Sequence, residues 1–182
     1  MHADHLPRVV ADSIAVRQPE SVGVADVGLH AAVSAPIQHV EHLEAKLGVI
    51  LFQLPPAFKK DAALLKDFLQ DIPPGMRAAF EFRHASWFDD EVFGLLKDKN
   101  IALCVADSET LSTPMVATAD YGYLRLRRED YQADDVQRWG ECITAEGKRW
   151  SDAFIYFKHE ESGIGPKLAM QLREKLEAGG QS

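Results

Sequence analysis

The sequence predicts an α/β protein that forms a partial TIM (β/α)8-type barrel, with parallel strands alternating with helices. Three observations predict it. Short apolar segments alternate with segments of helical periodicity from residue 49 onward, and the 182 residues, 46% of them hydrophobic, suffice for one domain with a sizeable core. Polar residues also gather on one face at the end of each expected strand. Alternating strands and helices imply parallel strands with right-handed crossovers.

The expected elements follow one another in a regular order. Strands are expected at Val49–Leu54, Arg77–Arg83, Ile101–Ala106, Tyr121–Arg127 and Ala153–Lys158. Apolar residues at helical spacing predict helices at Pro36–Leu47, Asp61–Gln70, Asp89–Asp98, Asp134–Glu146 and Gly165–Glu177. The connection around Pro114 lacks such a pattern and is expected to be mostly loop.

The side chains at the strand ends favour a barrel over an open doubly wound sheet. In the second expected strand, Glu81 and Arg83 lie on the face opposite Phe80 and Phe82. The corresponding polar residues elsewhere are Gln53, Asp107, Tyr123, Arg125, Arg127, Tyr156 and Lys158. Helices cover both faces of an open parallel sheet, whose strands are near-continuously apolar, whereas alternate residues line the interior of a barrel. The expected site therefore lies at the carboxyl-terminal mouth of the strands.

Composition argues against several classes of partner. The net charge of −8 and pI near 5.3 disfavour non-specific binding to nucleic acid or to an anionic membrane. No apolar run reaches the roughly 18 residues of a membrane span, and no signal peptide is visible. Cys104 and Cys142 are isolated and are expected to be reduced thiols. The expected location is the cytoplasm.

The number of strands is smaller than a closed barrel requires. A closed barrel of this type has eight strands, whereas about five are found here. Residues 1–35 contain only weak apolar runs, Arg8–Val16 and Val22–Leu29, and are too short for three strand–helix units. We therefore expect a poorly ordered leader over residues 1–35 and a partial barrel domain over residues 36–182.

A series of motifs in residues 36–182 resembles the domain-of-unknown-function 72 family, also called YecE-like. The motifs are Leu47-Gly48, Ile50-Leu51-Phe52-Gln53-Leu54-Pro55-Pro56 with Phe58, Ala79-Phe80-Glu81-Phe82-Arg83-His84 with Ser86-Trp87-Phe88, Leu103-Cys104-Val105-Ala106-Asp107-Ser108, Tyr123-Leu124-Arg125-Leu126-Arg127 and Phe154-Ile155-Tyr156-Phe157-Lys158-His159-Glu160. They occur in order over about four-fifths of the chain. The resemblance implies a TIM-barrel fold and implies no particular activity.

The beginning of the chain departs from that family. Family members are longer and open with a strand that carries a Gly-Thr-Ser-Gly-Trp-like sequence, and two further strands follow before the part that is matched here. Residues 1–35 contain none of these motifs. The resemblance therefore suggests an N-terminally truncated member, or one whose first residues come from a shifted reading frame.

The expected site supports two interpretations. Glu81 and Asp107, with Arg83, are the candidate catalytic residues, because charges in a barrel mouth can act in acid–base chemistry or orient a substrate. The candidate substrate-binding residues are Gln53, His84, Trp87, Arg125, Tyr156 and Lys158. The alternative is a structural network of ion pairs, since buried charges persist only when paired. For Trp87, packing is the simpler interpretation.

No metal site or particular cofactor is predicted. Glu81, Asp107, His84 and His159 have suitable ligand atoms but no diagnostic spacing, so a surface or helix-capping role is favoured for the histidines. The expected ligand is a small phosphorylated or carboxylated molecule, bound or turned over at the mouth. The alternative is a non-enzymatic or inactive fragment that needs self-association, as a homo-oligomer, or a partner.

Overall fold

The described part of the chain forms one parallel sheet. The computed structural model describes residues 8–10, 48–128, 130–157 and 164–179. Within these residues the strand order is β1-β6-β5-β4-β3-β2, and every neighbouring pair is parallel. The strands are β1 (Arg8–Val10), β2 (Ile50–Gln53), β3 (Ala78–Glu81), β4 (Ala102–Asp107), β5 (Tyr121–Leu126) and β6 (Asp152–Phe157).

Among the described residues, four α-helices connect or follow the strands where the sequence predicts them. They are α2 (Ala62–Asp71), α3 (Asp90–Asp98), α4 (Ala133–Glu146) and α5 (Gly165–Gly179). Short 3-10 helices, η2 (Ala85–Trp87) and η3 (Gly147–Arg149), precede α3 and follow α4. The side chains of Asp61 and Asp89 accept hydrogen bonds from backbone N–H groups in the first turns of α2 and α3, and so define where these helices begin.

The predicted strands and helices of residues 49–177 are confirmed, with small differences at their ends. The predicted helix Pro36–Leu47 lies outside the described residues. Strand β1 lies within the segment that was expected to be a leader, and it pairs in parallel with β6. In a closed barrel the last strand pairs with the first, so β1 has the neighbour that a first barrel strand would have.

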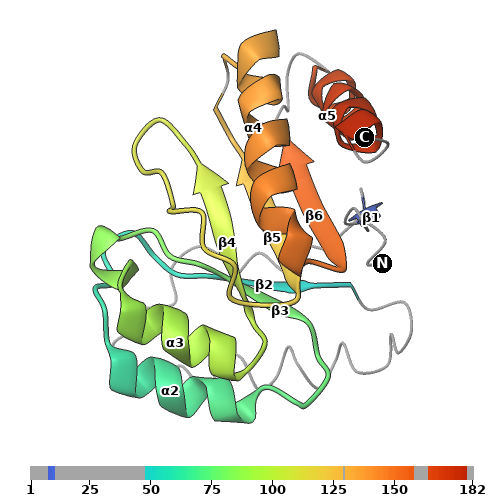
Figure 1. The fold of residues 1–182 in the computed structure, drawn as a ribbon. Coiled ribbons are helices and arrows are strands. Elements are labelled where there is room, and N and C mark those ends of the chain that lie inside the picture. Colours follow the sequence, from blue (N-terminus) through green and yellow to red (C-terminus); the bar gives the residue numbers. More distant parts are fainter. Residues whose placement is uncertain (1–7, 11–47, 129, 158–163, 180–182) are drawn as a thin grey trace.

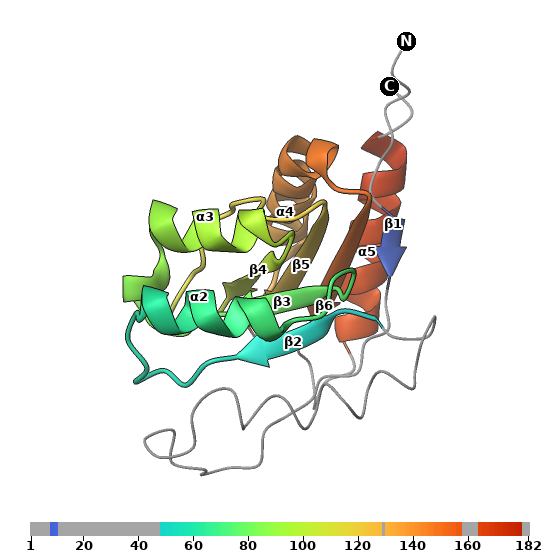
Figure 2. The same cartoon turned by 90° about the horizontal axis from the view of Figure 1, so that it is seen from below.

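Helices pack on one face of the sheet. Phe80, Phe82 and Leu103 lie in a buried cluster with α2 and α3. Val105, Leu124 and Ile155 lie in a second buried cluster with α4 and α5. Figures 1 and 2 show α2 and α3 beside the half of the sheet that contains β3, and α4 and α5 beside the half that contains β6. This helix-covered face is called the outer face below.

The opposite, inner face carries a third buried cluster that contains no residue of these helices. Its members are Val49, Leu51, Ala79, Ala102, Cys104, Tyr121, Tyr123 and Phe154, with Ala119 and Tyr156 packed against them. These residues alternate along the strands with those of the outer face, as expected for strands that are buried on both sides.

The inner face is concave. The Tyr121 hydroxyl on β5 lies 2.9 Å from both the nitrogen and the oxygen of Ala78 on β3, although β4 lies between these strands. Arg77 Nη1 lies 2.7 Å from Asp152 Oδ2 on β6, three strands away. Side chains stand roughly perpendicular to a flat sheet, and β3 and β6 would there be about 14 Å apart. These contacts therefore require the sheet to curl toward its inner face, as in a barrel.

Candidate functional site at the carboxyl ends of the strands

Glu81 is the centre of a polar cluster on the inner face. It is the last residue of β3, and only 2% of it is exposed. Gln53 Nε2, from the end of β2, donates a hydrogen bond of 2.7 Å to Glu81 Oε1. Arg125 from β5 forms an ion pair with Glu81 Oε2, and Arg127 Nη1 lies 3.7 Å from Oε1. Three strands therefore contribute to one cluster around a buried carboxylate.

The two arginines are held differently. The guanidinium of Arg125 directly contacts Glu81. Burial alone would lower the pKa of Arg125, but the charge of Glu81 and the hydrogen bond to it outweigh burial and raise this pKa. Arg127 lies at a longer distance from Glu81, its side chain is 27% exposed, and its Nε has no hydrogen-bond partner among the described residues. Arg127 therefore keeps donors available for another group.

Cys104 lies beneath this cluster on β4. Its Sγ is 3.9 Å from Glu81 Oε2, and the residue is fully buried. Burial raises the pKa of the Cys104 thiol well above its usual range, and the neighbouring charge of Glu81 raises it further. A thiol that stays protonated is a poor nucleophile. The position of Cys104 therefore indicates packing and a weak contact to Glu81 rather than covalent catalysis.

Aromatic side chains adjoin the charged cluster. Tyr156 on β6 is the direct register partner of Arg125 on β5. The ring of Tyr156 lies 5.3 Å from that of Tyr123, which in turn packs on Phe154 at 6.4 Å. Tyr156 is half-buried. The cluster of Glu81 and the two arginines therefore has an aromatic wall on the β6 side.

Asp107 lies elsewhere, and the expectation that it shares a face with Glu81 is wrong. Asp107 has the same parity as Val105, which packs on the outer face with α4 and α5. Its Oδ2 accepts a hydrogen bond of 2.8 Å from the Tyr131 hydroxyl and lies 3.1 Å from Arg128 Nε. On β4 the inner face instead carries Ala102 and Cys104. Glu81 and Asp107 therefore do not form a pair of acids.

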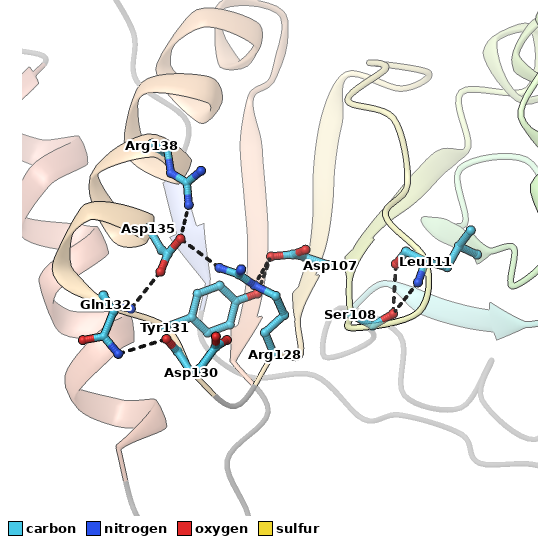
Figure 3. A network of polar contacts seen from close by, with 9 residues as sticks. All are labelled: Asp107, Ser108, Leu111, Arg128, Asp130, Tyr131, Gln132, Asp135 and Arg138. Atoms are coloured by element: carbon cyan, nitrogen blue, oxygen red, sulfur yellow. Dashed lines mark hydrogen bonds and ion pairs between the residues drawn. The ribbon is translucent and has the colours of Figure 1, made fainter.

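Asp107 belongs to a second polar network between the ends of β4 and β5 and the start of α4 (Figure 3). Arg128 connects Asp107 to Asp135, with 2.9 Å between its Nη2 and Asp135 Oδ1. Its guanidinium also lies 4.8 Å from the centre of the Tyr131 ring. Asp135 Oδ2 accepts a hydrogen bond of 2.9 Å from the backbone N–H of Gln132, the N-cap of α4. This contact, followed by Arg128 and Arg138, lowers the pKa of Asp135.

The remaining candidate residues occupy different environments. Arg83 is exposed beyond the end of β3. His84 caps η2, since its Nδ1 accepts a hydrogen bond of 3.1 Å from the Ser86 N–H, which confirms the capping interpretation. Trp87 is 1% exposed, stacks on Phe82 with ring centres 4.7 Å apart, and belongs to the outer-face cluster. Its position confirms the packing interpretation. Lys158 lies outside the described residues.

Arg127 was expected on the inner face without being named as a candidate site residue, and Cys104 was not expected in the cluster. The alternation Tyr123-Arg125-Arg127 contains the signal for Arg127, because it places all three side chains on one face. Cys104 carries no such signal, since Ala102–Ala106 is buried on both faces and no polar residue marks which side is inner. The face of Asp107 could not be read from its strand for the same reason.

Among the described residues, no group of three or more His, Cys, Asp or Glu side chains could hold a metal ion. None of the described helices combines the length and the apolar character needed to cross a membrane.

A curled parallel sheet with helices on its outer face, and with a charged cluster where its strands end, defines an α/β protein of the barrel-like class. The model of the family described as "Protein of unknown function DUF72" matches residues 11–182. The chain belongs to this family. The matched region begins well before residue 36, the expected start of the partial barrel domain.

Solved structures agree with the fold. A DUF72 family protein from Thermotoga maritima superposes with a TM-score of 0.71 at 23% identity, covering 81% of this chain and 65% of that chain. Two structures of a DUF72 family protein from Enterococcus faecalis superpose with TM-scores of 0.61 and 0.68, both at 16% identity, covering 81% and 82% of this chain and 66% of theirs. The chain thus spans slightly less than two thirds of the length of these structures. No curated protein matches the chain.

Proposed function

We propose that the protein binds a small anionic molecule, phosphorylated or carboxylated, beside Glu81 at the carboxyl ends of the strands. The observation that carries this proposal is the composition of the cluster. One buried carboxylate faces two arginines, Arg125 and Arg127, so the cluster has one positive charge more than Glu81 neutralises. Arginine is well suited to carboxylate and phosphate groups because its donors form a planar fork.

The cluster supports binding more strongly than proton transfer. Gln53 and Arg127 lie against Glu81 Oε1, and Arg125 lies against Oε2. An acid whose oxygens are already engaged is better placed to hold the arginines than to exchange a proton with a ligand. In this proposal Glu81 and Arg125 build the site, Arg127 contacts the anion, and Tyr156 forms an apolar wall beside it.

The test is a calorimetric titration with inorganic phosphate, and separately with acetate. Arg127→Ala is expected to weaken binding of the bound anion by about tenfold or more, since a charge-assisted hydrogen bond contributes roughly 1.5–3 kcal/mol. Arg173→Ala is the matched control, because Arg173 is an exposed arginine on α5 whose partner is Glu177. Equal affinity in the wild type, Arg127→Ala and Arg173→Ala would show that the anion does not bind here.

A second, non-enzymatic candidate function is that of a subunit in an assembly. Among the described residues, β1 and β2 are the edges of the sheet and each pairs with one strand only. Edge strands present backbone groups that can pair with another chain. Sedimentation velocity tests this candidate: a concentration-dependent shift from monomer to dimer supports it, and a compact monomer over the whole concentration range argues against it.

A further inference from the structure

Arg127 and its neighbour Arg128 serve opposite faces of the sheet. Arg127 reaches Glu81 on the inner face, while Arg128 reaches Asp107 and Asp135 on the outer face. Successive side chains of an extended segment point in opposite directions, so the backbone that places one arginine also places the other. Whatever fixes Arg128 therefore limits the positions that Arg127 can take.

Arg128 is fixed from three sides (Figure 3). Its Nη2 lies 2.9 Å from Asp135 Oδ1 and its guanidinium lies over the ring of Tyr131. Its Nε lies 3.1 Å from Asp107 Oδ2, an ion pair without hydrogen-bond geometry. The hydrogen bond to Asp135 is the largest of the causes that raise the pKa of Arg128. Asp107 is the end of β4, and Asp135 lies in the first turn of α4. Arg128 thus joins two elements that flank the site.

The backbone at Arg127 is held by the same elements. The N–H of Arg127 donates a hydrogen bond of 2.8 Å to the carbonyl of Asp107. The Tyr131 hydroxyl donates to the side chain of that aspartate at 2.8 Å. Arg127 and Tyr131, both between β5 and α4, are therefore each bonded to the last residue of β4.

We propose that Arg128 is a positioning residue for anion binding, which acts by holding the backbone of Arg127 so that its guanidinium faces the inner cluster. The proposal rests on the proposed function and extends it to a residue on the opposite face of the sheet. Asp107 and Asp135 serve as the two anchors of Arg128. Small displacements of a binding group can cost much of its contribution, so the effect on affinity should be measurable.

The test is a double-mutant cycle with inorganic phosphate as the ligand. Affinity is measured for the wild type, Arg127→Ala, Arg128→Ala and the double variant. Arg128→Ala is expected to weaken phosphate binding by about fivefold in the wild-type background. It is expected to change affinity by less than about twofold in the Arg127→Ala background, because the positioned group is then absent.

Arg138→Ala is the matched control for loss of charge. Arg138 also pairs with Asp135, but its side chain is 69% exposed and it is joined to Asp135 within α4. Arg138→Ala removes the same charge as Arg128→Ala but leaves the contacts of Arg128 with β4 and α4 in place. Phosphate affinity is therefore expected to stay within about twofold of wild type. Arg128→Lys, which cannot span both aspartates, serves if Arg128→Ala does not fold, and an intermediate loss of affinity is expected.

The outcomes separate the inference from the proposed function. If Arg127→Ala does not weaken phosphate binding, both are wrong. If Arg127→Ala weakens it and Arg128→Ala does not, only the positioning role is wrong. If Arg128→Ala weakens phosphate binding equally in the wild-type and Arg127→Ala backgrounds, the positioning role is also wrong. A side-chain NMR signal of Arg127 Nε that moves on phosphate addition in wild type, but not in Arg128→Ala, would support the positioning role independently of affinity.

Discussion

At the scale of single residues, the central feature is a buried acid whose partners come from other strands. Glu81 is 2% exposed, and Arg125 and Gln53 reach it from β5 and β2. Removing one partner of a buried pair leaves the other charge without compensation, and this costs more than the intact pair contributes. The stability of the fold and the arrangement of the site therefore depend on the same residues.

Glu81→Gln is expected to lower the free energy of unfolding by about 3 kcal/mol, because it leaves the positive charge of Arg125 uncompensated. The control is Glu177→Gln, which removes the same charge from an exposed pair on α5. That change is expected to cost less than about 1 kcal/mol. Urea unfolding followed by circular dichroism measures both, and equal losses in the two variants would show that Glu81 is not held as described.

The two cysteines should differ in reactivity. Burial raises the pKa of Cys104, whereas Cys142 is exposed on α4. Because only the thiolate reacts, a raised pKa keeps Cys104 unreactive at pH 8 and moves its reaction to higher pH. In the folded Cys142→Ser variant, labelling by a disulfide reagent should be at least about a hundredfold slower than in wild type. Rapid labelling of that folded variant would contradict the buried position of Cys104.

Some site residues lie where the sequence predicts them, and others do not. Gln53, Glu81, Arg125 and Tyr156 lie together as their alternation predicts, because the apolar residues beside them show which face packs on helices. Asp107 ends a strand whose other residues are apolar on both faces, so the direction of its side chain depends on tertiary contacts with Tyr131 and Arg128 that no local pattern reveals.

At the scale of elements, one close contact requires glycine in β5. Gly122 lies under the ring of Trp150, and a Cβ atom added at Gly122 would lie 2.6 Å from Trp150 Cε3. Trp150 follows η3 and is buried in the outer-face cluster. Glycine at this position therefore lets the segment between α4 and β6 pack directly on the strand.

Gly122→Ala is expected to lower the free energy of unfolding by about 1–3 kcal/mol, since the Trp150 ring must move out of a packed site. Gly94→Ala is the matched control, because Gly94 lies in α3 and a Cβ there meets nothing within 4 Å. Alanine in a helix interior is expected to stabilise by about 0.5–1 kcal/mol. Thermal unfolding of both variants would test the opposite signs, and a neutral Gly122→Ala would contradict the close packing.

The elements themselves were largely predictable. The helices α2 and α3 follow capping aspartates and have apolar residues at helical spacing, so their beginnings and extents could be read locally. Strand β1 could not, because three residues are too short for a periodic pattern and its position depends on pairing with β6. The loop between β4 and β5 is likewise organised by contacts such as Thr118, whose hydroxyl donates to the carbonyl of Ile101.

At the scale of the whole molecule, the curl of the sheet brings the site together. Contacts across β4 join β5 to β3 at both ends of the inner face: Tyr121 with Ala78 near the start of the strands, and Arg125 with Glu81 at their ends. Arg77 and Asp152 join β3 to β6 on the same side. The strand ends therefore converge, and charges from different strands form one cluster.

The most direct test of the account is a crystal structure of the protein with selenate, an anion whose anomalous scattering identifies its position. We expect an anomalous peak within hydrogen-bond distance of the Arg127 guanidinium on the inner face, and loss of that peak in crystals of the folded Arg127→Ala variant. Selenate bound only at surface arginines such as Arg173, with none beside Arg127, would contradict the account.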